Sequence, residues 1–338
     1  MKGQHRVQVW DNTVRYDFVL SRNITIIRGD SGTGKTTLYN LIQEVNQKQN
    51  SGITLNCDCG CFALTDFDWE DVIYRHPASI IFVDENFSWL KSEKFASIVN
   101  SADNYFVLIT RAYLPMLAYS INEVYSIHVS GKYVTLNNEY EITVNELKNV
   151  YSKELSYPPK TITPDYVLCE DSNFGYELFD KLSEKIFAEC HSAHGKSNVP
   201  ERLLDLDEDS DKRYLVIVDG AAYGSEMGAT VRYVYDHPNC FLYAPESFEW
   251  LLLKVMFSKD PVIYSILKNP SDYAESTKYL SWERYFTHVL EEHTKGTDLE
   301  YHKKKLNKKY LYSKAVSILS KFLLDSNINF DKCIELKK

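Results

Sequence analysis

The stretch NITIIRGDSGTGKTTLYNLIQEV, residues 23–45, decides the fold of the first half of the chain. Residues 23–28 form a compact apolar run that predicts a buried strand, and the apolar residues of 38–45 recur at the spacing of a helix. Between them lies GDSGTGKT, residues 29–36, which matches the pattern G-x-x-x-x-G-K-[ST] at every fixed position. A glycine-rich turn between a strand and a helix is typical of loops that bind the phosphates of a nucleotide.

Each fixed position of this loop has a physical role in holding a nucleoside triphosphate. Gly29 and Gly34 permit backbone geometry that other residues resist. Backbone N–H groups around residues 32–36 and the helix N-terminus point at the β-phosphate. Lys35 is predicted to reach the β- and γ-phosphates, and Thr36 to bind Mg²⁺. The predicted nucleotide-binding residues of the loop are Gly29, Asp30, Ser31, Gly32, Thr33, Gly34, Lys35, Thr36 and Thr37.

Two further apolar runs end in polar residues and predict strands of the same sheet. Residues 80–85, IIFVDE, bring two acids to the phosphate edge. Asp84 is predicted to hold Mg²⁺, and Glu85 to orient or deprotonate the attacking water, which favours hydrolysis over transfer to a small acceptor. Residues 106–111, FVLITR, place Arg111 as a candidate contact for the γ-phosphate, with a solvated arginine at a strand end as an equal alternative.

Residues 5–130 resemble the ABC-type ATPases, in the reduced form seen in DNA-repair and phage-defence ATPases. The resemblance rests on a strand pair before the loop, GDSGTGKTTL, IIFVDEN and VLITR. It implies ATP and Mg²⁺ as cofactors. Arg111 stands where that family usually has a histidine, and the helical lobe with its L-S-G-G-Q signature is missing. We therefore expect slow hydrolysis by the isolated chain, or an oligomer or hetero-partner that completes the ATP site.

The second half contains two more apolar strands that end in acids. Residues 166–171, YVLCED, and residues 214–220, YLVIVDG, are separated by a helical segment, so both strands end at one edge of a parallel sheet. Glu170 and Asp219 are then predicted to converge. Converging carboxylates repel each other unless a cation neutralises them, and Mg²⁺ accepts such oxygen ligands. Carboxylate-bound Mg²⁺ is a common device for cleaving phosphodiesters.

This arrangement resembles a TOPRIM domain, as in topoisomerases, primases and the overcoming-lysogenization-defect (OLD) nucleases of phage defence. In that family a glutamate ends one strand and Asp-x-Asp ends a later one. Glu170 and Asp219 match these positions, and the resemblance implies that they are catalytic metal ligands. The second aspartate is missing after Asp219, and Asp171 or Glu246 is a candidate substitute. An ATPase joined to a TOPRIM domain is the layout of the OLD nucleases.

The predicted fold class is α/β, with two domains and a linker. Residues 1–145 are predicted to be a P-loop ATPase domain with a mainly parallel sheet, closed by a hairpin that is broken at Gly131-Lys132. The proline-containing residues 146–163 are the predicted linker. Residues 164–338 are the predicted TOPRIM-like α/β domain, with a helix over 175–190 and a helical C-terminal segment from 247 onward.

Composition limits the partners that the chain is expected to have. The formal net charge is −9, so a basic footprint for nucleic acid has to be local. Residues 295–338 hold eleven lysines and five acidic residues, and the run Lys303–Lys309 is a candidate contact for DNA or RNA, or else a solvated helix face. No apolar run is long enough to cross a membrane, and the chain lacks a secretion signal, so we expect a cytoplasmic protein.

Three cysteines alternate at Cys57, Cys59 and Cys61. A half-buried strand is the favoured interpretation, because a zinc site needs a fourth ligand and usually a C-x₂-C spacing. Cys190-His191 is interpreted as a helix end and loop.

Together these patterns predict an ATP-binding and hydrolysing protein that couples nucleotide state to a Mg²⁺-dependent, nuclease-like activity on nucleic acid. One alternative is an ATP-gated sensor or assembly subunit whose second half is non-catalytic and recruits an effector. Another is a small-molecule kinase. The sequence does not distinguish ATP from GTP, nor does it identify the trigger.

Overall fold

The computed structural model describes the chain except residues 49, 135–140, 152–156, 207–210, 304–306 and 332–338. The described residues form two compact units: Met1–Val150 with Asn269–Ser281, and Tyr151–Lys268 with Trp282–Lys338. The first domain was expected to end at residue 145, and 269–281 was expected in the second domain. The contacts of that segment explain the difference. The Gly3 amide donates to the Ser271 carbonyl at 2.7 Å, and the Asn23 side chain donates to the Leu280 carbonyl at 2.7 Å.

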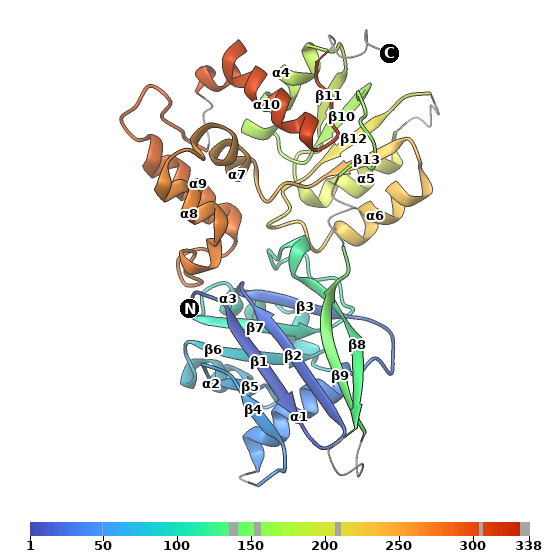
Figure 1. Ribbon diagram of the computed structural model, residues 1–338, viewed down its shortest axis with the longest axis vertical. Helices are drawn as coiled ribbons and strands as arrows, with labels where there is room; N and C mark the ends of the chain where they lie inside the picture. The colour runs from blue at the N-terminus through green and yellow to red at the C-terminus, as the bar shows by residue number, and fades with distance from the viewer. Residues whose placement is uncertain (49, 135–140, 152–156, 207–210, 304–306, 332–338) are drawn as a thin grey trace. The chain divides into compact units, whose positions relative to one another are not determined.

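The first unit is built on one mixed, mostly parallel sheet with helices (Figure 1). Among the described residues its strands are β1 (His5–Trp10), β2 (Val14–Leu20), β3 (Ile24–Arg28), β4 (Thr54–Asn56), β5 (Cys61–Ala63), β6 (Ser79–Asp84), β7 (Asn104–Ile109), β8 (Val124–Val134) and β9 (Glu141–Asn149). Their spatial order is β4-β1-β2-β9-β8-β3-β7-β6-β5. The helices are α1 (Lys35–Gln47), α2 (Trp69–Arg75) and α3 (Glu93–Val99).

This sheet is rolled rather than flat. Its outermost strands, β4 and β5, are joined by only the four residues Cys57–Gly60. An extended connection of that length spans at most about 17 Å, whereas nine flat strands would measure about 38 Å across. Helix α1 fills the inside of the roll, where it contacts β1, β5 and β6 and buries Leu38, Leu41 and Ile42. Strands β6 and β7 are buried along their whole length, which is why their sequences read as continuous apolar runs.

The hairpin at the end of the first unit differs from the prediction. Strand β8 runs through Gly131 and Lys132 instead of turning there, and the register shifts between Val129 and Gly131 as in a β-bulge. Residues 135–140 connect β8 to β9 and lie outside the described residues. Because β9 extends to Asn149, the predicted linker began inside a strand, and part of that linker (152–156) is not described.

The second unit holds a parallel sheet of β10 (Tyr166–Cys169), β11 (Glu189–Ser192), β12 (Tyr214–Ile217) and β13 (Cys240–Tyr243), in the order β11-β10-β12-β13 within the described residues. Its helices are α4 (Phe174–Glu184), α5 (Val199–Leu204), α6 (Met227–Asp236), α7 (Phe248–Leu252), α8 (Pro261–Lys268), α9 (Trp282–Thr294) and α10 (Ser313–Asp325). Helix α10 contacts α4, and α5 contacts α6.

The predicted helix over 175–190 is too long. Helix α4 ends at Glu184, and Phe187 has a positive φ of 60°, which a continuing helix does not allow. The chain then forms β11, so Cys190 and His191 lie on a strand rather than at a helix end.

Strand order in the second unit reverses between β10 and β12. The chain moves from β10 outward to β11, then crosses to β12 and continues outward to β13. Ligands of open α/β sheets bind at the carboxyl ends of the strands at such a reversal point. Glu170 directly follows β10, and Asp219 lies two residues beyond the end of β12.

Of the helices that the structure describes, none combines the length and the apolar composition that crossing a bilayer requires.

Candidate functional site

The glycine-rich loop and the two acids predicted to accompany it lie at the same edge of the first sheet. Ile27 of β3 is in register with Ile109 of β7, and Ile109 is in register with Asp84 of β6. The three strands are parallel, so the loop that begins at Gly29 emerges beside Asp84 and Arg111. Strand β7 lies between β3, which leads into the glycine-rich loop, and β6, which ends in the two acids.

The loop backbone adopts conformations that its glycines make possible. Gly29 has a φ of 144° and Gly34 a φ of 89°. A Cβ on Gly34 would lie 2.7 Å from the hydroxyl oxygen of Tyr16, which donates a hydrogen bond of 2.8 Å to the Gly34 carbonyl. Gly34 is the residue before the first turn of α1, so the amides of that turn open toward the loop. This cradle fits an anionic group at the N-terminus of a thirteen-residue helix.

Lys35 holds the loop together from inside. Its ammonium group donates to the carbonyls of Gly29 and Asp30 at 2.7 and 2.6 Å and to Thr33 Oγ1 at 3.3 Å. The residue is 7% exposed. Ser31, Thr36 and Thr37 are exposed at the loop surface. The loop therefore offers one buried cation, hydroxyl groups and helix amides within a single turn of chain.

The acids at the end of β6 lie in two different environments. Asp84 is buried, and its Oδ1 accepts from the Asn86 amide and side chain at 3.1 and 2.6 Å. Burial raises the pKa of the Asp84 carboxyl, although Lys35 is near enough to oppose this effect. Partial burial alone would raise the pKa of Glu85, but hydrogen bonds and charge from Arg111 lower it below its usual range.

Glu85 and Arg111 form a pair across β6 and β7. The Arg111 amide donates to Glu85 Oε2 at 3.1 Å, and its guanidinium lies 3.3 Å from Oε1. Arg111, predicted as a γ-phosphate contact, thus lies beside the predicted water-orienting residue. The pair keeps Glu85 ionised and fixes its direction at the loop edge.

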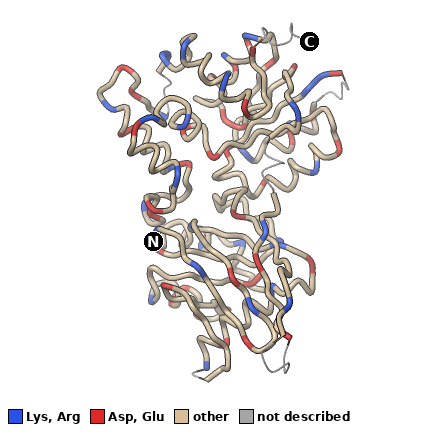
Figure 2. The backbone as a smooth tube through the Cα atoms, in the orientation of Figure 1, with Lys and Arg blue, Asp and Glu red and all other residues tan. Residues whose placement is uncertain are grey.

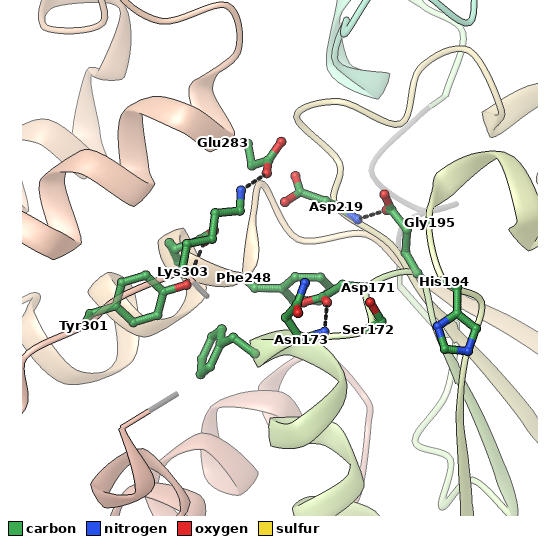
Figure 3. Close-up of a pocket in the computed structure, with 13 residues that line it drawn as sticks. Asp171, Ser172, Asn173, His194, Gly195, Asp219, Phe248, Glu283, Tyr301 and Lys303 are labelled. Carbon is green, nitrogen blue, oxygen red and sulfur yellow. Dashed lines mark hydrogen bonds and ion pairs between the residues drawn. The ribbon is translucent and has the colours of Figure 1, made fainter. Parts of the chain in front are cut away.

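In the second unit a cavity of about 240 Å³ opens at the carboxyl ends of β10 and β12 (Figure 3). Acidic side chains dominate its wall. The lining residues are Glu170, Asp171, Ser172, Asn173, Phe174, His194, Gly195, Asp219, Phe248, Glu249, Glu283, Tyr301 and Lys303. The cavity contains both acids that the sequence predicted to converge.

Glu170 and Asp219 are joined directly. The backbone N–H of Asp219 donates a hydrogen bond of 2.7 Å to Glu170 Oε2, which Figure 3 marks with a dashed line. Burial raises the pKa of Glu170 to about 8. Burial also raises the pKa of Asp219, and the charges of Glu283 and Glu170 act in the same direction. Each carboxylate is therefore costly to ionise unless a cation is near.

Two further acids of the cavity wall are held by hydrogen bonds. Asp171 caps α4 by accepting from the amides of Asn173 and Gly175. Glu249 on α7 is 3% exposed and accepts from the Tyr301 hydroxyl at 2.9 Å. Burial raises the pKa of both carboxyls.

Of the two predicted substitutes for the missing aspartate, Asp171 lines the cavity and Glu246 does not. Glu249 and Glu283 were not predicted from the sequence. Ser247, the N-cap residue of α7, was the available signal for Glu249, because it begins a helix directly after a strand end.

Lys303 lines this cavity. It was predicted to lie on a solvated helix face or to contact nucleic acid. Its side chain is 47% exposed, it lies in a turn rather than on a helix, and its ammonium group pairs with Glu283 (Figure 3). Burial alone would lower the pKa of Lys303, but Glu283 and Glu249 raise it above its usual range.

The rest of the basic run is only partly described. Lys309 pairs with Asp298 at 2.7 Å, and residues 304–306 and 332–338 lie outside the described residues. Figure 2 shows lysine and arginine interspersed with acids in both units. Among the described lysines of the segment, Lys303 and Lys309 are thus each paired with an acid.

Five carboxylates and one ammonium group line this cavity, although in the part of the chain that the structure describes no three of the five bring their oxygens within 4.8 Å of one another. Oxygen ligands from aspartate and glutamate are those that Mg²⁺ prefers. The buried carboxyls, whose pKa values are raised, release protons when such a cation binds. No protein-family model matches this sequence, and no curated protein is significantly similar to it.

Proposed function

We propose that this protein binds and hydrolyses ATP in its first unit and uses the acidic cavity of its second unit for Mg²⁺-dependent cleavage of nucleic-acid phosphodiesters. The observation that carries the ATPase proposal is the register of Ile27, Ile109 and Asp84, which brings the glycine-rich loop, Asp84 and Glu85 to one edge. In this proposal the loop is a P-loop, and the first unit is a reduced ABC-type ATPase domain.

Different residues would bind different parts of the triphosphate and its Mg²⁺. The N-terminal amides of α1 and Lys35 bind the β- and γ-phosphate oxygens. Thr36 and Asp84 would hold Mg²⁺, which neutralises charge that develops on the phosphates. Glu85, kept ionised by Arg111, orients the attacking water. Arg111 lies near enough to this edge to contact the terminal phosphate.

The nuclease proposal rests on the cavity and treats the second unit as TOPRIM-like. Glu170 and Asp219 lie at the reversal point of the sheet and would hold Mg²⁺ together with Glu249 or Asp171. A bound metal would polarise the phosphodiester and lower the pKa of a bound water molecule. Lys303 would contact the phosphate of the bound strand, because its side chain enters the same cavity.

A non-catalytic second unit that recruits an effector is the competing function, and one observation favours it. The Lys303 ammonium pairs with Glu283, and its charge acts on Asp219 and Glu249. The charge of Lys303, together with protonated carboxyls, would stabilise the cavity without a metal ion.

The ATPase proposal is tested with Lys35→Ala and Thr36→Ala, measuring binding of a fluorescent ATP analogue and phosphate release. Lys48→Ala is the matched control, because Lys48 directly follows α1 and its exposed ammonium group pairs with Glu44. We expect both loop variants to lose at least tenfold in affinity, about 1.4 kcal/mol, and the control to be unchanged. Unaltered affinity in Thr36→Ala and Lys35→Ala would exclude the proposal.

The nuclease proposal is tested by cleavage of plasmid and single-stranded DNA with Mg²⁺ or Mn²⁺, with and without ATP. Glu170→Gln and Asp219→Asn keep the side-chain shapes and should abolish cleavage. Asp236→Asn, an exposed acid of α6 outside the cavity, is the control. No cleavage by the wild type under any of these conditions would favour the non-catalytic function.

A further inference from the structure

A second cluster of ligand side chains lies at the closure of the first sheet, far along the chain from the glycine-rich loop. The connection Cys57–Gly60 joins the two outermost strands of the roll, and His5 is the first residue of β1, which pairs with β4. Cys57, Cys59 and Cys61 were expected on one half-buried strand. Instead, Cys57 and Cys59 lie in this connection, and only Cys61 belongs to a strand.

Four side chains of the cluster are linked by short contacts, each to at least one of the others. His5 Nδ1 lies 2.8 Å from Asp58 Oδ1, and the ligand atoms of His5, Asp58 and Cys59 all lie within 4.8 Å of one another. Cys57 Sγ lies 3.6 Å from Asp58 Oδ1 and 3.7 Å from Cys59 Sγ. Two sulfurs bound to one tetrahedral zinc at 2.3 Å would lie about 3.8 Å apart. The sulfur separation therefore already equals that of a metal site.

The hydrogen bonds of His5 leave its inner nitrogen facing the cluster. His5 Nε2 lies 3.2 Å from the carbonyl oxygen of Lys2, which accepts a hydrogen bond from this nitrogen in the tautomer that carries the proton there. In that tautomer the Nδ1 lone pair faces Asp58 Oδ1 at 2.8 Å, and a metal ion bound by both atoms would stabilise this arrangement. A histidine oriented by a backbone carbonyl in this way is typical of metal ligands.

The burial of these side chains is also consistent with a structural metal site. The His5 side chain is 13% exposed and packs edge-on against Tyr105, whereas Asp58 is 62% exposed. Cys57 and Cys59 are half-buried, and Cys61 is buried beneath them. One side of the cluster is thus open to solvent, and the other rests on the protein core.

We propose that His5, Cys57, Asp58 and Cys59 form a structural zinc site that fastens the connection between the two outer strands to β1. The donor set is one imidazole nitrogen, one carboxylate oxygen and two thiolates, a tetrahedral set that zinc accepts. Cys61 supports the site from below and is not a ligand. The site is independent of the nucleotide loop and of the acidic cavity.

The test uses the full chain, purified without chelator and with reduced thiols. Bound zinc is measured by atomic emission, and Co²⁺ is then exchanged into the protein and followed by its absorption. We expect one zinc per chain and a thiolate-to-cobalt charge-transfer band with tetrahedral ligand-field bands. His5→Gln, Cys57→Ser, Cys59→Ser and Asp58→Asn should each lower Co²⁺ affinity at least tenfold. Cys190→Ser, a half-buried cysteine of the second unit, is the matched control.

The outcomes separate this site from its alternatives. Cys61→Ser should retain the metal, and loss of metal in that variant together with retention in Asp58→Asn would overturn the ligand set. Absence of zinc and of a charge-transfer band from reduced wild-type protein would overturn the site itself. Removal of zinc should lower the melting temperature without changing ATP turnover at a temperature where the protein is folded. Zinc that is retained after Cys57→Ser and Cys59→Ser are combined is adventitious and rejects the proposal.

Discussion

The Asp219 amide and the Glu170 carboxylate are joined by a hydrogen bond of 2.7 Å between the ends of two neighbouring parallel strands. This bond fixes the direction of Glu170 at the wall of the acidic cavity. It also opposes the effect of burial, which raises the pKa of Glu170 to about 8. The position of the Glu170 carboxylate at the cavity wall is therefore set by the backbone of the neighbouring strand end.

The first prediction is a loss of stability with rising pH in metal-free protein. Glu170 has a pKa of about 8 in the folded state against 4.5 ordinarily, so between these values the folded state binds the extra proton. Stability is then complete below about pH 4.5 for this group and falls as pH rises toward 8. We expect the melting temperature to fall by roughly 5 °C from pH 6 to pH 8.5. Scanning calorimetry with EDTA measures it.

The matched variants for this first prediction are Glu170→Gln and Asp236→Asn. Glu170→Gln removes the titrating group and should flatten the pH dependence, and Mg²⁺ should flatten it in the wild type by favouring the carboxylate. Asp236→Asn should leave the slope unchanged. A wild type whose stability rises from pH 6 to pH 8.5 would contradict the assignment.

The second prediction concerns Lys303→Met. Removing the ammonium group takes away the positive charge that interacts with Glu283, Glu249 and Asp219. Metal-free stability should fall, and affinity for Mn²⁺ should rise, by about threefold to tenfold, because the ion no longer competes with Lys303. Titration calorimetry measures the affinity. Lys309→Met, which removes an exposed pair with Asp298, should change little. Weaker Mn²⁺ binding in Lys303→Met would show that Lys303 does not oppose the metal.

The third prediction concerns Gly34→Ala in the loop. The added Cβ would lie 2.7 Å from the Tyr16 hydroxyl, and the φ of 89° is unfavourable for alanine. We expect a loss of about 1–2 kcal/mol in stability, together with a large loss of nucleotide affinity. Adding Tyr16→Phe removes the colliding oxygen and should recover part of the affinity. Denaturant unfolding and nucleotide titration check both statements, and full nucleotide affinity in Gly34→Ala alone would contradict them.

The fourth prediction concerns Asp84→Asn. The substitution keeps the side-chain shape. Burial raises the pKa of Asp84, so the ionised carboxylate lowers the stability of the metal-free fold. Metal-free stability should be kept or increased. Nucleotide affinity should lose its dependence on Mg²⁺, with about a tenfold loss in the presence of Mg²⁺ and little change in EDTA. An equal loss in both conditions would assign Asp84 a purely structural role.

The strand ends were predictable from sequence because short apolar runs followed by acids are local patterns. Asp84, Glu170 and Asp219 were each located by such a run, whereas Lys35 was located by the glycine-rich loop pattern. The parallel sheets bring the loop and Asp84 to one edge, and Glu170 and Asp219 to another. The sequence did not show which of the neighbouring acids would line the cavity with Glu170 and Asp219. Glu246 follows β13 just as Asp171 follows β10, yet only Asp171 lines the cavity.

The rest of the acidic cavity depends on tertiary structure. Glu283 lies in the first turn of α9 and Lys303 lies in a turn, and neither position carries a local pattern that points to Glu170. The sequence of the lysine run gives its charge, but it does not show that Lys303 pairs with Glu283. Strand β11 was missed because its four residues, ECHS, continue a helical segment without an apolar run. The sequence predicted a break at Gly131-Lys132, whereas a β-bulge accommodates Gly131 within β8.

The shortness of the two outer strands of the rolled sheet limits how this protein can assemble. Strands β4 and β5 have three residues each, so another chain could add few ladder hydrogen bonds at either of these edges. The first unit is therefore protected against edge-to-edge growth into larger aggregates. Any partner that docks on the first unit would contact side chains of its loops and helices instead of extending the sheet at β4 or β5.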